Sequence, residues 1–221
     1  MIKLFLEVKN LKSKKLAFEI KKSGFPHSSF FGIIYLVIEM TLNDLKIECE
    51  KCEKCELCRS RTRLVFGDGV ENAKVMLIGE APGKDEDEQG KPFVGRSGKL
   101  LTETLAQVGL SRTNNVYIAN MVKCRPPENR DPKTDEKEAC INYLLKQIEL
   151  VNPKIVLCLG RVSASYFLGK DFKVTKQHGE IFEIDGRQFS ATFHPAAILR
   201  NINNKPLFDA DIEKIAKKAL D

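Results

Sequence analysis

The sequence has no run of about 18 apolar residues, which is the length that a membrane-spanning helix needs. The best candidate, 30-FFGIIYLVIEM-40, is too short and is interrupted by Glu39. A basic stretch precedes this segment, but the segment lacks the A-x-A-like cleavage site of a secretory signal peptide. These absences argue against a secreted or membrane-spanning chain, so we expect a cytoplasmic protein without a membrane partner.

The sequence also lacks internal repeats and low-complexity linkers. Its 221 residues, of which 43% are hydrophobic, are enough to bury one full core. Residues 1–40 differ in composition from the rest and end at Met40, just before a helix-like segment with Thr41 as its N-cap. We therefore expect an N-terminal extension over 1–40, either an appended element or a misassigned start, and one domain over 41–221.

The formal net charge of +6 is unevenly distributed. Residues 1–40 contain seven Lys and three Glu, which leaves 29 basic and 27 acidic residues for 41–221. Because this larger part is nearly neutral, the isoelectric point of about 8.9 is weak evidence for a nucleic-acid partner. Evidence for function has to come from the residues of a site.

Short apolar runs bounded by turn residues predict strands at 74–80, 116–122, 154–160 and 188–193. Between them, apolar residues at helical spacing predict helices at 98–109, 134–151, 161–168 and 207–220. Strands that alternate with helices indicate an α/β fold with a mostly parallel, four-stranded central sheet covered on both faces.

In such a sheet, the functional loops leave the carboxyl ends of the strands. Three of these loops are rich in polar side chains here: 79-GEAPGKDEDEQGKPFVG-95, the segment from Asn120 to 123-KCRPPENR-130, and 194-HPAAILR-200. We expect one composite site built from these residues: Glu80, Glu86, Phe93, Asn120, Asn129 and His194.

Seven cysteines in a Lys-rich chain without a secretion signal indicate a metal or cluster in a reducing compartment rather than disulfides. Cys158 lies in an apolar run and is expected to be a buried small side chain. The other six are Cys49, Cys52, Cys55, Cys58, Cys124 and Cys140.

The first four of these cysteines are spaced C-x2-C-x2-C-x2-C, a strong signal for metal or iron–sulfur binding. One arrangement uses these four alone, like a ferredoxin loop. However, Arg59 stands where the ferredoxin pattern has Pro. We favour a second arrangement, in which two of them join Cys124 and Cys140. Four thiolates suit zinc as well as a cluster, so the spacing does not identify the metal.

The series CEKC, RTRLVFGDG, GEAPGKDEDEQGKPFVGRSGKLL, NMVKCRPPENRDP, a further Cys and HPAAILR resembles the family 4, iron–sulfur uracil-DNA glycosylases. The resemblance covers about residues 41–221 in order and spacing. It implies the three-layer α/β/α fold of the uracil-DNA glycosylase superfamily. The implied activity is that of a monofunctional DNA repair hydrolase, which flips uracil out of DNA, hydrolyses its N-glycosidic bond and leaves an abasic site.

The resemblance also implies a cofactor and substrate contacts. A structural [4Fe–4S] cluster would be held by Cys52, Cys55, Cys124 and Cys140. Phe93 would stack on the flipped base, and Asn120 would pair with uracil O4 and N3–H in a pattern that cytosine inverts. His194 would hydrogen-bond to uracil O2 and stabilise the departing anion. Each of these three side chains also has a simpler interpretation: Phe93 could pack in the core, Asn120 could hold a turn, and His194 could begin a helix.

Glu80 and Glu86 align with active-site positions, where a carboxylate stabilises the positive charge that develops on the sugar. Glu86 is also a candidate for excluding the thymine methyl group. Ala81 and Gly83 align with the uracil-binding loop. Other branches of the superfamily carry Asp at the position of Ala81, where it activates water. Asn129 is our candidate for activating water in this chain. The other acids of the loop are expected to form a solvated turn: Asp85, Asp87 and Glu88.

Positive side chains flank the loops and are expected to hold phosphates. The predicted DNA contacts are Arg61, Arg96, Lys123 and Arg200. Leu199 or Arg200 would wedge into the base stack. The expected partner is uracil-containing DNA, single- or double-stranded, bound by a monomer, with a sliding clamp or other repair proteins as further candidates.

Two alternatives stay open. A metal-stapled α/β binding module would recognise nucleotides or nucleic acid without chemistry, because a fold does not fix a function. A glycosylase of a neighbouring family would accept broader substrates, although the GEAPG segment argues against it. The joint presence of Glu80, Phe93, Asn120 and His194 favours the uracil-specific enzyme.

Overall fold

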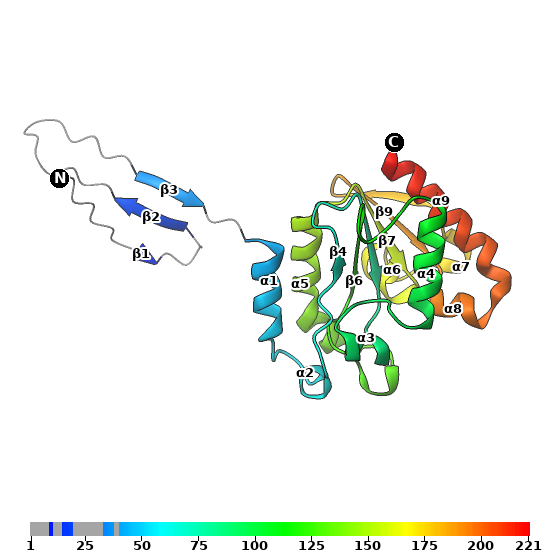
Figure 1. The fold of residues 1–221 in the computed structure, drawn as a ribbon, viewed down its shortest axis with the longest axis horizontal. Coiled ribbons are helices and arrows are strands. Elements are labelled where there is room, and N and C mark those ends of the chain that lie inside the picture. The colour runs from blue at the N-terminus through cyan, green and yellow to red at the C-terminus, as the bar shows by residue number, and fades with distance from the viewer. Residues whose placement is uncertain (1–8, 11–14, 20–32, 38–39) are drawn as a thin grey trace, which may run out of the picture. The chain divides into compact units, whose positions relative to one another are not determined.

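The computed structural model describes residues 9–10, 15–19, 33–37 and 40–221 (Figure 1). The chain forms two compact units, Met1–Thr41 and Leu42–Asp221. In the first unit, β1 (Lys9–Asn10), β2 (Lys15–Glu19) and β3 (Ile33–Val37) form an antiparallel sheet in that order. The unit boundary lies beside the predicted one. Most of residues 1–39 lie outside the described part, so the status of the extension stays a prediction.

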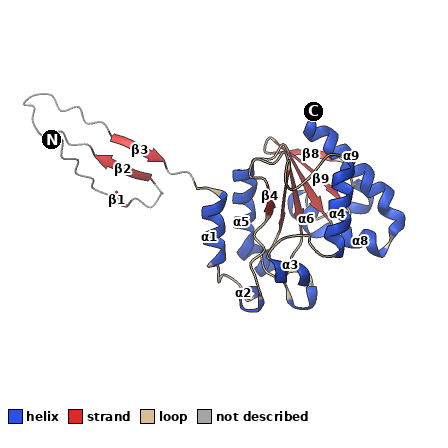
Figure 2. Cartoon of the chain, viewed as in Figure 1, coloured by secondary structure: helices blue, strands red, loops and turns tan. Residues whose placement is uncertain are grey.

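The second unit is built on a central sheet flanked by helices (Figure 2). The sheet has six strands in the order β4-β6-β5-β7-β9-β8. Its strands are β4 (Asp68–Gly69), β5 (Val75–Gly79), β6 (Val116–Asn120), β7 (Ile155–Leu159), β8 (Ile181–Ile184) and β9 (Arg187–Thr192). The four inner strands are parallel, whereas β4 and β8 pair antiparallel at the edges. Every residue of β5, β6 and β7 is buried, as expected for strands covered on both faces.

The four inner strands are those that the sequence predicted, so the α/β fold class is confirmed. The two edge strands were not predicted. β4 is only two residues long, and β8 carries Glu183 and has no buried residue, so neither shows the apolar run of a core strand.

Helices cover both faces of the sheet (Figure 1). They are α1 (Leu42–Glu50), α2 (Leu57–Ser60), α3 (Lys84–Gln89), α4 (Arg96–Gln107), α5 (Thr134–Val151), α6 (Arg161–Phe167), α7 (Val174–Gln177), α8 (Pro195–Arg200) and α9 (Lys205–Leu220), with 3-10 turns η1 (Pro127–Asn129) and η2 (Ile202–Asn204). The helix predicted at 134–151 has these same bounds, and the one predicted at 98–109 begins two residues earlier and ends at Gln107.

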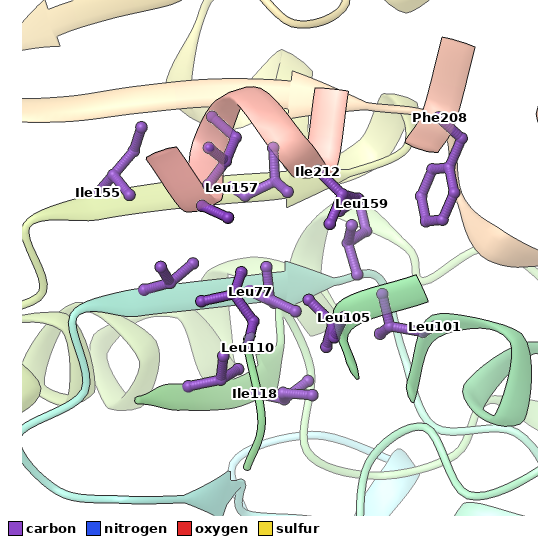
Figure 3. Packing of buried hydrophobic residues seen from close by; sticks show 14 of the residues in the cluster. Leu77, Leu101, Leu105, Leu110, Ile118, Ile155, Leu157, Leu159, Phe208 and Ile212 are labelled. Carbon is purple, nitrogen blue, oxygen red and sulfur yellow. The ribbon is translucent and has the colours of Figure 1, made fainter. Parts of the chain in front are cut away.

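The main core lies between one face of the sheet and α4, α8 and α9. Alternate residues of each strand point to this face, for example Leu77 of β5 and Leu157 of β7 (Figure 3). Leu101 and Leu105 of α4, which are one helical turn apart, pack against them together with Phe208 of α9. The opposite face is covered by α5 and α6, and α1 packs on α5.

The parallel strands bring the loops that follow β5, β6, β7 and β9 to one edge of the sheet. Among the described residues, no helix combines the length and the apolar character that crossing a membrane would require.

Candidate active site

A pocket of about 630 Å³ lies at this edge of the sheet. It is lined by all eight residues that the sequence predicted for catalysis and uracil binding: Glu80, Ala81, Gly83, Glu86, Phe93, Asn120, Asn129 and His194. They come from three separate loops, and the parallel sheet brings them together. Their individual roles stay predictions, but their convergence is a property of the fold.

Asn120 is the last residue of β6 and is 1% exposed. Its side-chain oxygen Oδ1 is buried and has no hydrogen-bond partner among the described residues. Such orphaned acceptors are uncommon in folded proteins and call for a physical reason. The oxygen belongs to a residue of the pocket lining, so a ligand with an N–H or O–H donor would satisfy it.

Gly79 allows the amide of Asn120 and the ring of Phe93 to lie close together. A Cβ atom at Gly79 would lie 2.6 Å from Cζ of Phe93 and would also overlap Oδ1 of Asn120. Any larger residue at this position would therefore push on both side chains. Gly79 was not predicted for the site, although it is the first residue of the GEAPG segment.

Phe93 has a left-handed backbone conformation with φ of 53°, which is unusual for an aromatic residue. Arg112 donates hydrogen bonds from Nη2 to the carbonyl of Phe93 (2.6 Å) and from Nη1 to that of Pro92 (2.5 Å). Gly98 fits directly under the Phe93 carbonyl, where a Cβ would overlap it. The strained conformation is thus held from two sides, and nothing local in the sequence indicated that Arg112 contributes to it.

Glu86 shapes the loop that carries Phe93. Its carboxylate accepts hydrogen bonds from the backbone N–H groups of Gly83 (3.1 Å), Val94 (2.9 Å) and Gly95 (2.9 Å). The first of these contacts caps the N-terminus of α3. Both carboxylate oxygens are therefore engaged by the backbone, even though Glu86 also lines the pocket.

The prediction of a solvated turn was wrong for Asp87. The segment forms α3, and Asp87 is 3% exposed. Both of its carboxylate oxygens accept from the backbone N–H of Thr62, each at 3.0 Å. A buried carboxylate needs such partners, and Asp87 joins the acidic loop to the segment that leads out of the cysteine region.

His194 follows β9 and is the N-cap of α8. Its ring lies 5.5 Å from that of Phe93, centroid to centroid. Burial, aided by Arg200, lowers the pKa of the imidazole to about 4, so the ring is neutral near pH 7. Because Nδ1 accepts a hydrogen bond from the N–H of Ala196 (3.1 Å), the single ring proton lies on Nε2. His194 therefore offers an N–H donor on its other nitrogen.

Glu80 begins the loop after β5. Burial, together with the neighbouring Asp131, raises the pKa of its carboxyl group to about 7, whereas Arg161 and Lys137 act in the opposite direction. Neither Asp131 nor Arg161 was predicted for the site. Arg161 follows β7 after one residue, Gly160, which is the N-cap of α6, so the strand-end rule used for the other three loops could have found it.

Asn129 lies in η1 and is exposed at the rim of the pocket. It and Glu128 both have φ of 55°. Its side-chain oxygen accepts a hydrogen bond from Nε of Arg125 (2.8 Å). That contact fixes the amide, but it also occupies one lone pair of the oxygen that would orient a water molecule.

The cysteines gather at a second place. A small cavity is lined by all six cysteines that were predicted as candidate metal or cluster ligands: Cys49, Cys52, Cys55, Cys58, Cys124 and Cys140. Burial raises the pKa of the thiol of Cys49 to about 12 and that of Cys124 to about 11. In the described part of the chain, no group of three or more His, Cys, Asp or Glu side chains is arranged to hold a metal ion. The donor set nevertheless fits a thiolate-bound centre, because soft sulfur ligands from three chain segments converge there.

Two predicted DNA contacts, Lys123 and Arg61, lie at this cavity; burial contradicts the predicted role of Lys123, whereas the role of Arg61, which is partly exposed, stays a prediction. Lys123 is 1% exposed, and its ammonium donates to the carbonyl of Asn120 (2.8 Å) and to Oε1 of Gln147 (2.5 Å). Arg61 donates to the carbonyl of Glu50 (2.8 Å) and to Sγ of Cys124 (3.4 Å). Both cations therefore lie beside buried thiols, where a phosphate cannot reach Lys123.

The other two predicted DNA contacts, Arg96 and Arg200, are exposed. Together with Leu199, which is 42% exposed, they line a shallow depression of about 400 Å³ that shares Glu86 and Asn129 with the main pocket. A cationic, partly apolar rim beside the pocket fits the predicted contact with DNA.

Comparisons with known proteins agree with this geometry. The sequence profile of the uracil DNA glycosylase superfamily matches residues 66–216. The chain is 40% identical over 185 residues to a type-4 uracil-DNA glycosylase of Archaeoglobus fulgidus, covering 80% of this chain and 92% of that protein. It is 44% identical over 159 residues to the type-4 enzyme of Thermotoga maritima (70% and 82%) and 42% identical over 189 residues to that of Sulfurisphaera tokodaii (81% and 86%).

Proposed function

Because this chain belongs to the uracil-DNA glycosylase superfamily and, within it, to the type-4 family, we propose that it removes uracil from DNA. In this reaction water replaces the base at C1′ of the deoxyribose, and an abasic site and free uracil are left. The single observation that carries the proposal for this pocket is the unpartnered Oδ1 of Asn120. It is a buried acceptor in a cavity large enough for a flipped nucleotide.

Uracil satisfies this acceptor, whereas cytosine does not. The N3–H of uracil would donate to Oδ1 of Asn120, and its O4 would accept from Nδ2. Cytosine presents an acceptor at N3 and a donor at the C4 amino group, so the same amide would face two mismatched groups. Each buried polar group left unpaired costs about 1–3 kcal/mol, which is enough for strong discrimination.

Phe93 and His194 would act on the base that Asn120 selects. Stacking on an aromatic ring is worth about 1–3 kcal/mol per base, which offsets part of the cost of unstacking the nucleotide. The Nε2–H of His194 would donate to uracil O2, where negative charge develops as the C1′–N1 bond breaks. A neutral histidine suits this role, because its Nε2–H donates a hydrogen bond to uracil O2 without giving up the proton.

The sugar becomes positively charged as uracil leaves, and the negative charge at the pocket rim would stabilise it. Glu80 is the predicted carboxylate for this purpose. Glu86 has both oxygens engaged by backbone N–H groups, so we propose that it acts by holding Phe93 in place. Asn129 remains the candidate for orienting the attacking water.

We propose that Cys52, Cys55, Cys124 and Cys140 hold a [4Fe–4S] cluster. When bound, such a cluster supplies a covalent tie between the segments that carry its ligands, and no redox step in the reaction is needed. The support is the gathering of thiols in one cavity, next to Lys123 and Arg61. The positive charges of these two side chains would offset the negative charges of thiolates. Lys123 also donates to the Asn120 carbonyl, so the cavity is linked to the uracil site through one side chain.

The proposal is tested with anaerobically purified protein and a labelled oligonucleotide that contains a single uracil. Abasic sites are revealed by alkaline cleavage. We expect cleavage at uracil in single- or double-stranded DNA, and none when thymine or cytosine replaces it. Protein that binds the oligonucleotide but never produces abasic sites would favour the binding-module alternative. Sedimentation of the same preparation tests whether the protein is the expected monomer.

A further inference from the structure

The segment between Cys124 and α5 carries three consecutive residues that line the pocket: Asn129, Arg130 and Asp131. Asn129 and the preceding Glu128 both have a left-handed backbone conformation with φ of 55°. Such a conformation is costly for a residue with a long side chain, and it persists only where surrounding contacts hold it. The position of Asn129 at the pocket therefore depends on what anchors this segment.

A pair of hydrogen bonds anchors Arg130 to Glu136, in the first turn of α5. Nη1 of Arg130 donates to Oε2 of Glu136 (2.8 Å), and Nη2 donates to Oε1 (2.6 Å). Two such bonds between a planar guanidinium and a carboxylate fix orientation as well as distance. Glu136 is only 3% exposed, and its Oε2 also accepts from the backbone N–H of Lys133 (2.8 Å) at the start of α5. A buried carboxylate thus ties the pocket segment to α5.

Two other arginine contacts hold the same segment less firmly. Arg125 donates from Nε to Oδ1 of Asn129 (2.8 Å), but both residues belong to the segment itself. Arg161 donates from Nη2 to Oδ2 of Asp131 (2.9 Å), but these two side chains are 71% and 68% exposed. Exposed ion pairs contribute little, because solvent screens them and long side chains lose entropy in forming them. Of the three contacts, the one with Glu136 therefore does most to fix the segment to the rest of the fold.

Glu136 also lies close to the cysteine cavity along α5. Cys140 follows it by four residues, so the two side chains lie one helical turn apart on the same face. Both residues are buried, and Cys140 lines the cavity. One turn of α5 therefore meets the pocket segment, and the next turn meets the cysteines.

We propose that Glu136 is a positioning residue for uracil excision: through Arg130, it holds the backbone that presents Asn129 to the pocket. This inference rests on the proposed function, in which Asn129 is the candidate for orienting the attacking water. It assigns a role to Glu136, which no motif in the sequence indicated.

Loss of the contact between Glu136 and Arg130 should affect the attack of water more than the binding of DNA. The predicted base contacts, Asn120 and Phe93, lie in other parts of the chain. A displacement of about 1 Å in a group that orients a reactant lowers a rate by about 100-fold. We therefore expect the single-turnover rate at saturating protein to fall by about 10- to 100-fold, and the dissociation constant for uracil-containing DNA to stay within about twofold.

The test compares Glu136→Gln, Arg130→Lys and the double variant in single-turnover excision of uracil. Glu136→Gln replaces one acceptor by a donor, and Arg130→Lys keeps the charge but cannot make both bonds in the same geometry. Each single variant should lower the rate. The double variant should be within about threefold of the slower single variant, because all three remove one shared contact. Effects that multiply would show that the two residues act independently, and would overturn the proposal.

Glu213→Gln is the control, because Glu213 forms an ion pair with Lys217 (2.8 Å) on α9, outside the pocket, and should leave the rate unchanged. Arg130→Lys carries the test if Glu136→Gln does not fold, since Arg130 is partly exposed. The iron content of both variants should equal that of the unaltered protein. Loss of iron would assign Glu136 to the cysteine centre and overturn the proposal.

A readout without activity separates this inference from the proposed function. The backbone N–H of Asn129 donates to the carbonyl of Pro126 (3.1 Å), and hydrogen exchange reports how often such bonds open. Exchange over 125–131, followed by mass spectrometry, should become about tenfold faster or more in Glu136→Gln and in Arg130→Lys. Exchange over α9 should stay the same.

The outcomes are distinguishable. If the segment exchanges faster in both variants but the unaltered protein does not excise uracil, the anchoring contact stands and the proposed function fails. If uracil is excised and its rate does not respond to the variants, the positioning role is wrong and the proposed function stands. A fall in the rate without faster exchange would also overturn the positioning role.

Discussion

Asn120→Ala should lower uracil excision while leaving the folded protein almost as stable as before. Without the amide, the N3–H and O4 of uracil lose their partners in the pocket. At about 1–3 kcal/mol for each unpaired group, the loss is about 2 kcal/mol or more, which corresponds to a fall in kcat/KM of at least about 30-fold. The preference for uracil over cytosine should fall by a similar factor, because the mismatched amide that disfavours cytosine is also removed.

The structure provides a matched comparison for stability. Gln147 is another fully buried amide, but it accepts from Lys123 and donates to the carbonyl of Phe66 (2.9 Å) and the hydroxyl of Tyr117 (3.1 Å). Gln147→Ala leaves these partners unpaired and should destabilise the fold by about 3 kcal/mol or more. Asn120→Ala removes an acceptor without a partner, so it should cost no more than about 1 kcal/mol.

The assay combines single-turnover excision from uracil and cytosine oligonucleotides with denaturant unfolding of both variants. If Asn120→Ala kept excision within about threefold of the unaltered protein, the recognition role of the amide would be refuted. If it destabilised the fold as much as Gln147→Ala, Oδ1 of Asn120 would have a structural partner in the folded protein.

Arg112→Lys should lower kcat/KM for uracil, because one ammonium cannot bond both carbonyls that hold Phe93 at positive φ; unchanged kinetics would show that the conformation needs no clamp. Glu80→Gln should raise the melting temperature at about pH 8 more than at about pH 4. The pKa of the Glu80 carboxyl group rises to about 7 on folding, so the stability that this group contributes below its unfolded pKa is lost as pH rises through 7. An equal effect on the melting temperature at both pH values would argue against a raised pKa. Cys55→Ala should abolish iron content and visible absorbance, whereas Cys58→Ala should keep both, and the reverse result would reassign the ligand.

Much of the fold was readable from the sequence because it depends on local patterns. Continuous apolar runs predicted the four inner strands, and helical spacing predicted α4 and α5 closely. The rule that loops at the carboxyl ends of parallel strands converge then placed Glu80, Asn120 and His194 in one site. Sequence separation did not hinder this step, because the sheet order brings the strand ends together whatever the lengths between them.

What the tertiary structure decided is the environment of each charge. The sequence shows that Lys123 is cationic, but only the packing of β6 against α5 buries its ammonium between Asn120 and Gln147. Arg112 lies 19 residues from the Phe93 carbonyl that it holds, and Arg161 lies 30 residues from Asp131. Such contacts depend on the positions of whole elements, and a charged residue in a loop looks the same in a sequence whether it meets solvent, a thiol or another carboxyl group. The sequence by itself therefore determined the eight predicted residues that line the pocket, and the fold alone determined which of them are hydrogen-bonded and which further residues, such as Arg112, hold them in place.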